Sequence, residues 1–203
     1  MRRSKEEAAR TRETVLHAAL SLFSQHGYSQ TTLAMIAKAA GYSRGPIYWH
    51  FRNKDELYEA VLDYSQRPLQ QLVKQAAQTT DAQRAVCDFI DNWFYLLLED
   101  RCYRQSFEIL LNKTELTDAL SRTLRRERRL TRSIVSTLGA RLQQINPDQP
   151  AEQQGLLCYT FLMGITQSWL FSPKLFDLAA LQPLFRQHLL RMLGLPTNTN
   201  VTS

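Results

Sequence analysis

The stretch that decides the fold is residues 31–54, which have the sequence TTLAMIAKAAGYSRGPIYWHFRNK. Its first half predicts a short helix that begins after the capping hydroxyls of Thr31 and Thr32 and ends at Gly41. The apolar residues of this helix recur at the spacing of one turn. They are Leu33, Ile36 and Ala37. One face of this helix is therefore expected to be buried.

The second half of the stretch predicts another short helix, which begins at Ser43 as its N-cap and runs to about His50. Pro46 fits because it lies in the first turn, where a backbone N–H would have no partner within the helix. Ile47 and Phe51 lie four residues apart and are expected to face the core. The opposite side of this helix is therefore predicted to be exposed.

Helices are also predicted on both sides of this stretch. Residues 5–26 have amphipathic spacing, and Gly27 is expected to end that helix. Asn53 and Glu56 are placed as a capping pair for the helix that follows. Further helices are predicted near residues 54–78, 81–99, 101–112, 115–144, 151–171 and 177–193, with breaks at Pro68, residues 148–150 and Pro173. Because no segment has the alternating pattern of a strand, the predicted fold class is all-α.

The composition is typical of a folded domain with a polyanionic partner. Of the 203 residues 44% are hydrophobic, and only 7 are Gly and 7 Pro. A formal net charge of +6 favours nucleic acid as a partner, and the basic residues gather near the start of the chain. These are Arg2, Arg3, Lys5, Arg10, Arg12, Lys38, Arg44, Arg52 and Lys54. The first three are expected to form either a minor-groove arm or a frayed basic tail.

Several other protein classes find no support in the sequence. The three cysteines follow no CxxC or histidine pattern, so we expect neither a disulfide framework nor a zinc site, and a reducing cytoplasm fits best. The charged N-terminus lacks the apolar segment of a signal peptide. Residues 153–173 are uncharged, but their glutamines, threonines and serines indicate a buried helix of a bundle rather than a membrane span. No glycine-rich phosphate loop or nucleophile elbow is present, and the four histidines are scattered, so we expect no enzyme, cofactor or metal.

The two short helices and the tight connection at residues 39–42 have the spacing of a helix-turn-helix, whose second helix lies in the DNA major groove. On that helix Arg44 and Tyr48 share the exposed face, and Arg44 can pair bidentately with a guanine edge. Gly45 and Pro46 leave little side chain between the helix and the groove floor. We therefore expect Arg44 to recognise a base and the other contacts to position the helix on phosphates. The predicted DNA contacts are Thr32, Tyr42, Ser43, Arg44, Gly45, Pro46, Tyr48, Trp49, His50 and Lys54.

This part of the chain resembles a known family. Residues 31–54, with Leu22-Phe23 and Gly27 before them and Glu56-Leu57 after them, are similar to the DNA-binding domain of TetR-family transcriptional regulators. The match covers about a quarter of the chain in an unbroken register. It implies a DNA-binding regulator.

Two further segments resemble the AcrR-like branch of that family, whose members repress multidrug efflux genes. They are Arg-Gly-x-Ile-Tyr-Trp-His-Phe at residues 44–51 and Trp-Leu-Phe-Ser-Pro at residues 169–173. The chain departs from the pattern at Tyr42, where the family has a smaller aliphatic residue, and at Pro46, which is commonly Ala or Thr. The DNA sequence preference of the branch therefore does not carry over.

The resemblance also implies that the C-terminal helices hold a ligand and form a homodimer. The predicted effector contacts are Trp93, Phe94, Phe107, Glu108, Tyr159 and Met163. Those of the dimer interface are Trp169, Leu181, Leu184, Phe185 and His188. Aromatic residues with one acid would suit a lipophilic cation. By their spacing alone, the aromatic residues favour an ordinary core and Glu108 a solvated position, so the ligand pocket rests on the resemblance.

A dense basic run lies near the middle of the chain. It comprises Arg122, Arg125, Arg126, Arg128, Arg129 and Arg132. It could form a second nucleic-acid patch, but its helical spacing favours a solvated helix face. Leu124 and Leu130 would then face inward, and Glu127 would reduce the repulsion between the arginines.

Together these patterns predict three parts of the chain. Residues 1–53 form a DNA-binding domain, residues 54–195 a helical domain for ligand binding and dimerisation, and residues 196–203 a disordered tail. The predicted function is a cytoplasmic homodimeric repressor of a multidrug efflux operon, which binds a near-palindromic double-stranded operator and is released by a small lipophilic effector. The alternatives are a TetR-type regulator of a non-efflux gene, a regulator without an inducer, and a helix-turn-helix used only for protein contacts.

Overall fold

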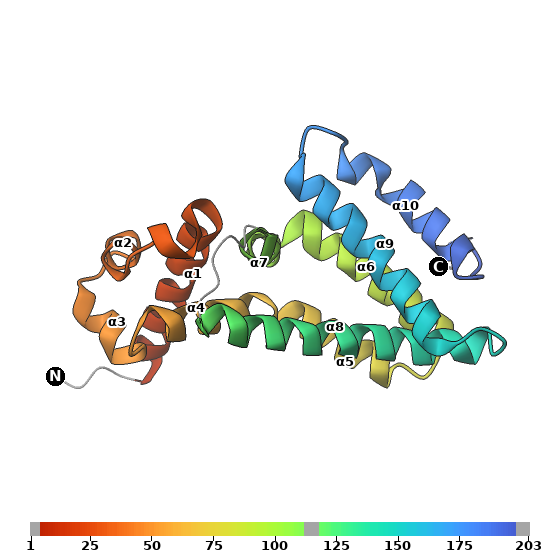
Figure 1. The fold of residues 1–203 in the computed structure, drawn as a ribbon, viewed down its shortest axis with the longest axis horizontal. Coiled ribbons are helices and arrows are strands. Elements are labelled where there is room, and N and C mark those ends of the chain that lie inside the picture. Colours follow the sequence, from red (N-terminus) through yellow and green to blue (C-terminus); the bar gives the residue numbers. More distant parts are fainter. Residues whose placement is uncertain (1–4, 112–117, 198–203) are drawn as a thin grey trace. The chain divides into compact units, whose positions relative to one another are not determined.

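The computed structural model describes residues 5–111 and 118–197, and in these ranges every regular element is a helix (Figure 1). The helices are α1 (Lys5–Gln30), α2 (Leu33–Ala39), α3 (Arg44–His50), α4 (Lys54–Ser65), α5 (Arg67–Gln78), α6 (Ala82–Glu99), α7 (Arg101–Leu111), α8 (Asp118–Ile145), α9 (Ala151–Phe171) and α10 (Leu178–Met192). The predicted all-α class is confirmed.

Some expectations concern residues that the structure does not describe. They are the basic residues Arg2 and Arg3, the side chains of Arg122 and Leu124, the start of the helix expected at residue 115, and the expected tail from residue 198 on. Of the predicted breaks, the one at Pro68 falls where α4 ends at Ser65 and α5 begins at Arg67. A proline is tolerated there because it lies in the first turn of α5.

The helices form two compact units, which are described separately. The first unit contains α1 to α4, α7 and the start of α8 up to Glu127, and the second contains α5, α6, the rest of α8, α9 and α10. The packing of the first unit thus extends past residue 53, because α4 and α7 share its core. The predicted division of functions between residues 1–53 and 54–195 stays a prediction.

The core of the first unit is built on α1, which packs against α4 and α7. Buried residues of five helices meet there, and they include Val15, Leu20, Phe23, Ile36, Ile47, Leu57, Val61 and Ile109. Gly27 interrupts α1 with a φ of +74°, and one more helical turn follows it to Gln30. The prediction that Gly27 breaks this helix therefore identified the right residue, although helical backbone resumes beyond it.

The helix caps explain where the short helices start. Thr32 caps α2, since its hydroxyl accepts a hydrogen bond from the Met35 N–H at 3.2 Å. Asn53 caps α4 in the same way, with the Glu56 N–H at 2.8 Å. The Glu56 carboxylate in turn accepts from the Arg52 N–H, so the predicted capping pair forms.

Two of the predicted caps do not form. The Thr31 hydroxyl donates to the Gly27 and Leu22 carbonyls instead of capping α2, and Ser43 also makes no cap. Ser43 occupies the N-cap position of α3, but its side chain makes no capping hydrogen bond. An N-cap side chain accepts from the second or third helical N–H, and the third residue of α3 is Pro46, which has none. The prediction that the Ser43 hydroxyl caps α3 was therefore wrong, although Ser43 does occupy the N-cap position.

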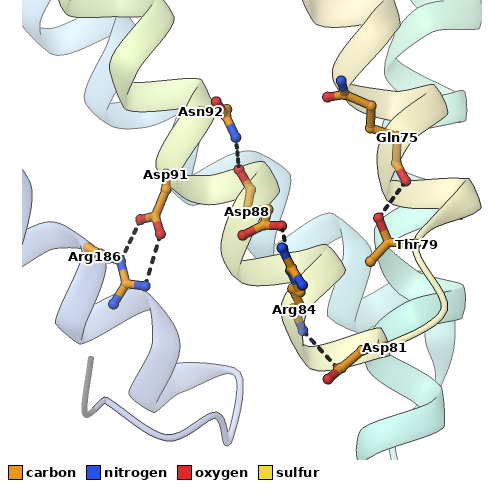
Figure 2. Close-up of polar contacts among 8 residues, drawn as sticks. All are labelled: Gln75, Thr79, Asp81, Arg84, Asp88, Asp91, Asn92 and Arg186. Carbon is orange, nitrogen blue, oxygen red and sulfur yellow. Dashed lines mark hydrogen bonds and ion pairs between the residues drawn. The ribbon is translucent and has the colours of Figure 1, made fainter. Parts of the chain in front are cut away.

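In the second unit α6 contacts both α9 and α10. The Trp93 indole N–H of α6 donates to the Thr166 hydroxyl of α9 at 3.1 Å, and both side chains are buried. Arg186 of α10 forms a two-point ion pair with Asp91 of α6, with the longer bond at 3.0 Å (Figure 2). These contacts hold α6 between its two neighbours.

The start of α6 is fixed by its own polar residues (Figure 2). Asp81 caps the helix by accepting from the Arg84 N–H at 3.0 Å, and the Arg84 guanidinium lies 3.4 Å from Asp88 one turn further on. Such an exposed pair within one helix contributes little stability. The cap therefore matters more than the ion pair for where α6 begins.

Helices α8 and α9 cross at two glycines. A Cβ on Gly155 would clash with the Val135 carbonyl oxygen, and one on Gly139 would clash with that of Ala151. Backbone therefore lies against backbone at this crossing, and any side chain would push the helices apart. Among the described helices, α9 included, none is both long and apolar enough to cross a membrane.

The substitution Gly155→Ala is expected to lower the free energy of unfolding by about 1–3 kcal/mol, because overpacked cores are destabilised by that amount. The midpoint of urea unfolding, followed by far-UV circular dichroism, measures this effect. Gly164→Ala is the matched control, because Gly164 lies in the same helix, is exposed and has open space around it. The control is expected to raise stability by up to about 1 kcal/mol. Equal midpoints for the two variants would contradict the tight crossing.

Candidate nucleic-acid interface

Helix α3 is attached to α2 by a tight backbone connection. The Tyr42 N–H donates to the Ala37 carbonyl at 2.9 Å, and the Gly41 N–H donates to the Lys38 carbonyl at 3.1 Å. Gly41 has a φ of +73°, a conformation that other residues rarely adopt. This connection fixes the direction in which α3 leaves α2, as a helix-turn-helix requires.

The inner face of α3 is held by two apolar side chains, as predicted. Ile47 is fully buried and Phe51 nearly so, in the core that α1 and α4 also line. The Arg12 guanidinium lies 5.3 Å from the centre of the Phe51 ring and covers its outer side. The orientation of α3 is therefore set by burial.

The outer face of α3 presents large side chains to solvent. Trp49 is 74% exposed and Tyr48 is 56% exposed, and Arg44 and Gly45 are exposed beside them. Two aromatic side chains left in water on one short helix indicate a contact surface rather than a core. A guanidinium, a phenol and an indole on this face can together form hydrogen bonds with bases and phosphates.

The other predicted DNA contacts lie in the same continuous segment. Thr32 is exposed and uses its oxygen for the helix cap, which leaves its O–H able to donate. Ser43 is exposed and its hydroxyl is not used in a cap. Tyr42, Pro46 and His50 are half-buried. The structure thus brings most of the predicted residues to one side of α2 and α3, while their contacts with DNA stay a prediction.

Lys54, another predicted DNA contact, forms hydrogen bonds within the protein. Its ammonium donates to the carbonyls of Tyr28 and Thr31, at 3.0 and 3.1 Å, and lies 4.1 Å from the centre of the Tyr28 ring. Lys54 thus ties the start of α4 to the end of α1 and the segment that joins α1 and α2. The Tyr28 hydroxyl donates to Asp55, so a second contact ties the same segment to α4.

The predicted effector contacts divide between the two units. Phe107, which is buried, and Glu108, which is half-buried, belong to α7 of the first unit. The others belong to the second unit, where Trp93 and Phe94 are buried and Tyr159 and Met163 are half-buried. A groove of about 730 Å³ lies elsewhere in the second unit, at residues 145–149, 153, 154, 157 and 191–194, and no predicted effector residue lines it.

Two residues that the sequence analysis did not single out as ligand contacts form a polar pair in the first unit. Gln66 is the C-cap of α4 and only 3% exposed, and its amide N–H donates to the Glu127 carboxylate at 2.6 Å. Among the described residues nothing donates to the buried Gln66 Oε1. Burial, and secondarily the Glu127 carboxylate, raises the pKa of Tyr58 to about 12, so this tyrosine stays protonated. Gln66 and Glu127 are 61 positions apart, so no local sequence pattern could have predicted this pair.

The predicted dimer residues lie on α9 and α10. Leu184 and His188 are exposed, and Trp169, Leu181 and Phe185 are half-buried. Other apolar side chains on these helices or the loop between them are also exposed, namely Leu156, Leu157, Phe171, Leu175 and Met192. So much apolar surface on adjacent elements is typical of a protein contact.

Comparisons with known proteins agree with this geometry. Residues 15–61 match the family described as bacterial regulatory proteins, tetR family. The HTH-type transcriptional regulator TtgR of Pseudomonas putida is 32% identical over 189 residues, which cover 88% of this chain and 89% of TtgR. This relative spans nearly the whole chain, so the likeness is not confined to the helix-turn-helix.

Solved structures of repressors share the fold. NalD, the secondary repressor of the MexAB-OprM multidrug efflux pump in Pseudomonas aeruginosa, has a TM-score of 0.74 and 27% identity over 94% of this chain and 96% of its own. SmeT in complex with triclosan has a TM-score of 0.76 and 25% identity over 90% of this chain and 91% of its own. SmeT is the repressor of the Stenotrophomonas maltophilia multidrug efflux pump SmeDEF. The chain therefore belongs to the tetR family of bacterial regulatory proteins, as a DNA-binding transcriptional regulator and not an enzyme.

Proposed function

We propose that this regulator is a homodimeric repressor of a multidrug efflux operon and that a small lipophilic effector releases it from DNA. The exposed face of α3 carries the proposal for DNA, because it combines Arg44 with two solvent-exposed aromatic side chains. The proposal for efflux rests on relatives such as NalD, a repressor of a multidrug efflux pump.

In the proposed complex α3 enters the major groove and Arg44 pairs with a guanine, which would give sequence preference. Tyr48, Trp49 and His50 would contact phosphates on either side of the groove and set the register. Lys54 would contact a phosphate next to them. An ammonium has three protons, and since two are donated to the carbonyls of Tyr28 and Thr31, the third is available to a phosphate.

Two recognition helices about one turn of DNA apart require a symmetric dimer. The apolar surface on α9 and α10 is the best candidate for its interface, because the predicted dimer residues and the exposed Phe171 and Leu175 all lie there. Helices of a dimer can bury such surface as a four-helix bundle.

For the effector, the first unit offers the polar pair of Gln66 and Glu127 as a candidate contact. A buried acceptor without a donor costs about 1–3 kcal/mol, and a donor group of a ligand would remove that cost. A carboxylate beside it favours a cationic donor. We infer that the effector is a lipophilic molecule with an N–H or O–H group, and that it binds the DNA-free conformation better, which would release DNA by linkage.

Arg44→Ala is expected to weaken binding to the preferred DNA by about 5- to 150-fold and to relax the preference at one base position. Lys54→Met is expected instead to weaken binding to all DNA sequences alike and to reduce the magnitude of the slope of log affinity against log salt by about one. Selection from a random duplex pool would first give the preferred DNA, and fluorescence anisotropy would then give each affinity.

Arg84→Ala is the control for these variants, because Arg84 is exposed on α6 of the second unit. It should leave both affinity and salt slope unchanged. DNA binding that is independent of salt, or an Arg44 variant that behaves like this control, would contradict the proposed interface.

Leu184→Lys is expected to raise the dimer dissociation constant by about 30-fold or more, because a charge at the centre of an apolar interface would be buried without a partner. Sedimentation velocity at a series of concentrations measures it. Tyr95→Lys is the control, since Tyr95 is also an exposed large hydrophobic residue but lies on α6. If both variants dissociate alike, or neither does, the interface lies elsewhere.

Gln66→Leu is expected to weaken the binding of rhodamine 6G, a lipophilic cation with N–H groups, by about 10-fold or more, as for the loss of a hydrogen bond to a charged donor. Quenching of tryptophan fluorescence follows the binding. Gln71→Leu provides the control, because Gln71 is exposed on α5. An unchanged affinity of the Gln66 variant for rhodamine 6G would contradict a role of this residue in effector binding.

A further inference from the structure

A chain of hydrogen-bonding side chains in the first unit has no role in the proposed function. His17 of α1 contacts two side chains from other helices. Its Nε2 lies 2.9 Å from the Tyr64 hydroxyl of α4, and its Nδ1 lies 3.4 Å from the Cys102 sulfur of α7. The Tyr64 hydroxyl also donates to the Glu13 carboxylate at 3.2 Å. A thiol, an imidazole, a phenol and a carboxylate are thus in sequence.

The hydrogen bonds decide where the imidazole proton lies. The Glu13 carboxylate can only accept, so the single Tyr64 proton points to it. The Tyr64 oxygen must then accept from His17, which places the imidazole proton on Nε2. Burial and the bond to Glu13 raise the pKa of Tyr64, so its hydroxyl remains protonated. Nδ1 is left as an acceptor, and it faces the Cys102 thiol.

This arrangement is the one that activates a thiol. A cysteine reacts as its thiolate, and a neighbouring imidazole that accepts the proton provides it near neutral pH. The carboxylate and phenol behind His17 orient the ring. His17 is exposed and Cys102 is half-buried, so small solutes can reach the sulfur.

The other two cysteines lie in different surroundings. Cys158 is fully buried, and burial raises its pKa to about 12. Burial also raises the pKa of the half-buried Cys87. The Arg186 guanidinium lowers this pKa and three aspartates raise it, with a net rise. In the part of the chain that the structure describes, Cys102 is the cysteine whose sulfur lies against an imidazole.

We propose that Cys102 is a covalent modification site for carbon electrophiles of the α,β-unsaturated carbonyl class, with His17 as the base. The thiol proton moves to His17 Nδ1, and the thiolate forms a carbon–sulfur bond with the β-carbon. The electron pair of the carbon–carbon double bond moves toward the carbonyl to give an enolate. The α-carbon then takes the proton from the imidazolium. The reaction is an addition and needs no oxidant or second thiol.

The adduct would act on the packing of the DNA-binding unit. Cys102 lies at the start of α7, and α7 packs on both α1 and α4, which hold the core behind α3. An added group at the sulfur separates the thiol from His17 and presses on these helices, and packed cores tolerate added volume poorly. Alkylation would therefore weaken DNA binding, a consequence that rests on the proposed function.

The test uses N-ethylmaleimide as the electrophile on the full chain, with the modification of each cysteine followed by peptide mass spectrometry at pH 7. Cys102 is expected to react at least about tenfold faster than Cys87, and Cys158 not at all in the folded protein. His17→Gln should slow the alkylation of Cys102 by about tenfold or more and leave the alkylation rate of Cys87 unchanged. Tyr64→Phe, which removes only the hydroxyl behind the ring, should slow Cys102 as well.

The outcomes are distinct. Equal rates at Cys102 and Cys87, or a Cys102 rate that His17→Gln leaves unchanged in a variant that keeps its helical circular dichroism, would overturn the site. The DNA consequence is tested with the selected duplex, whose binding should be lost on alkylation of the parent chain and retained in Cys102→Ser. Retention in both would overturn the consequence. If the untreated chain binds no DNA, the proposed function fails, while the labelling rates still decide the site.

Discussion

Everything in the first unit depends on the fact that α3, with seven residues, is too short to be stable alone. Burial of Ile47 and Phe51 supplies the stability that its own hydrogen bonds cannot. Because Pro46 also removes one of the two N–H groups that a serine cap could accept from, and Ser43 makes no cap, tertiary contacts carry an even larger share. The long helix α1, against which α3 packs, and the connection at Gly41 both hold this one short element.

Much of this fold could be predicted from the sequence, because its signals are local. The helix bounds follow from amphipathic spacing, and the caps at Thr32 and Asn53 lie within three residues of the N–H groups they accept from. The exposed residues of α3 follow from the same spacing. The family likeness then extends these local signals to the whole chain.

What could not be predicted is set by contacts between distant residues. The orientation of Lys54 depends on carbonyls of α1 more than twenty residues earlier, and the Gln66 and Glu127 pair spans 61 residues. The thiol of Cys102 meets His17 across 85 residues. Spacing along a helix identifies a face but not its neighbour, so the role of a polar side chain on that face is decided only by packing.

The three tryptophans sample three different surroundings. Trp49 is 74% exposed on α3, Trp93 is fully buried in α6, and Trp169 is half-buried on α9. Indole emission shifts to the blue as water is excluded from the ring, so the chain carries separate optical reporters for its candidate DNA surface, the core of its second unit and its candidate subunit contact. Single-tryptophan variants would let one spectrum be assigned to each surface without any attached dye.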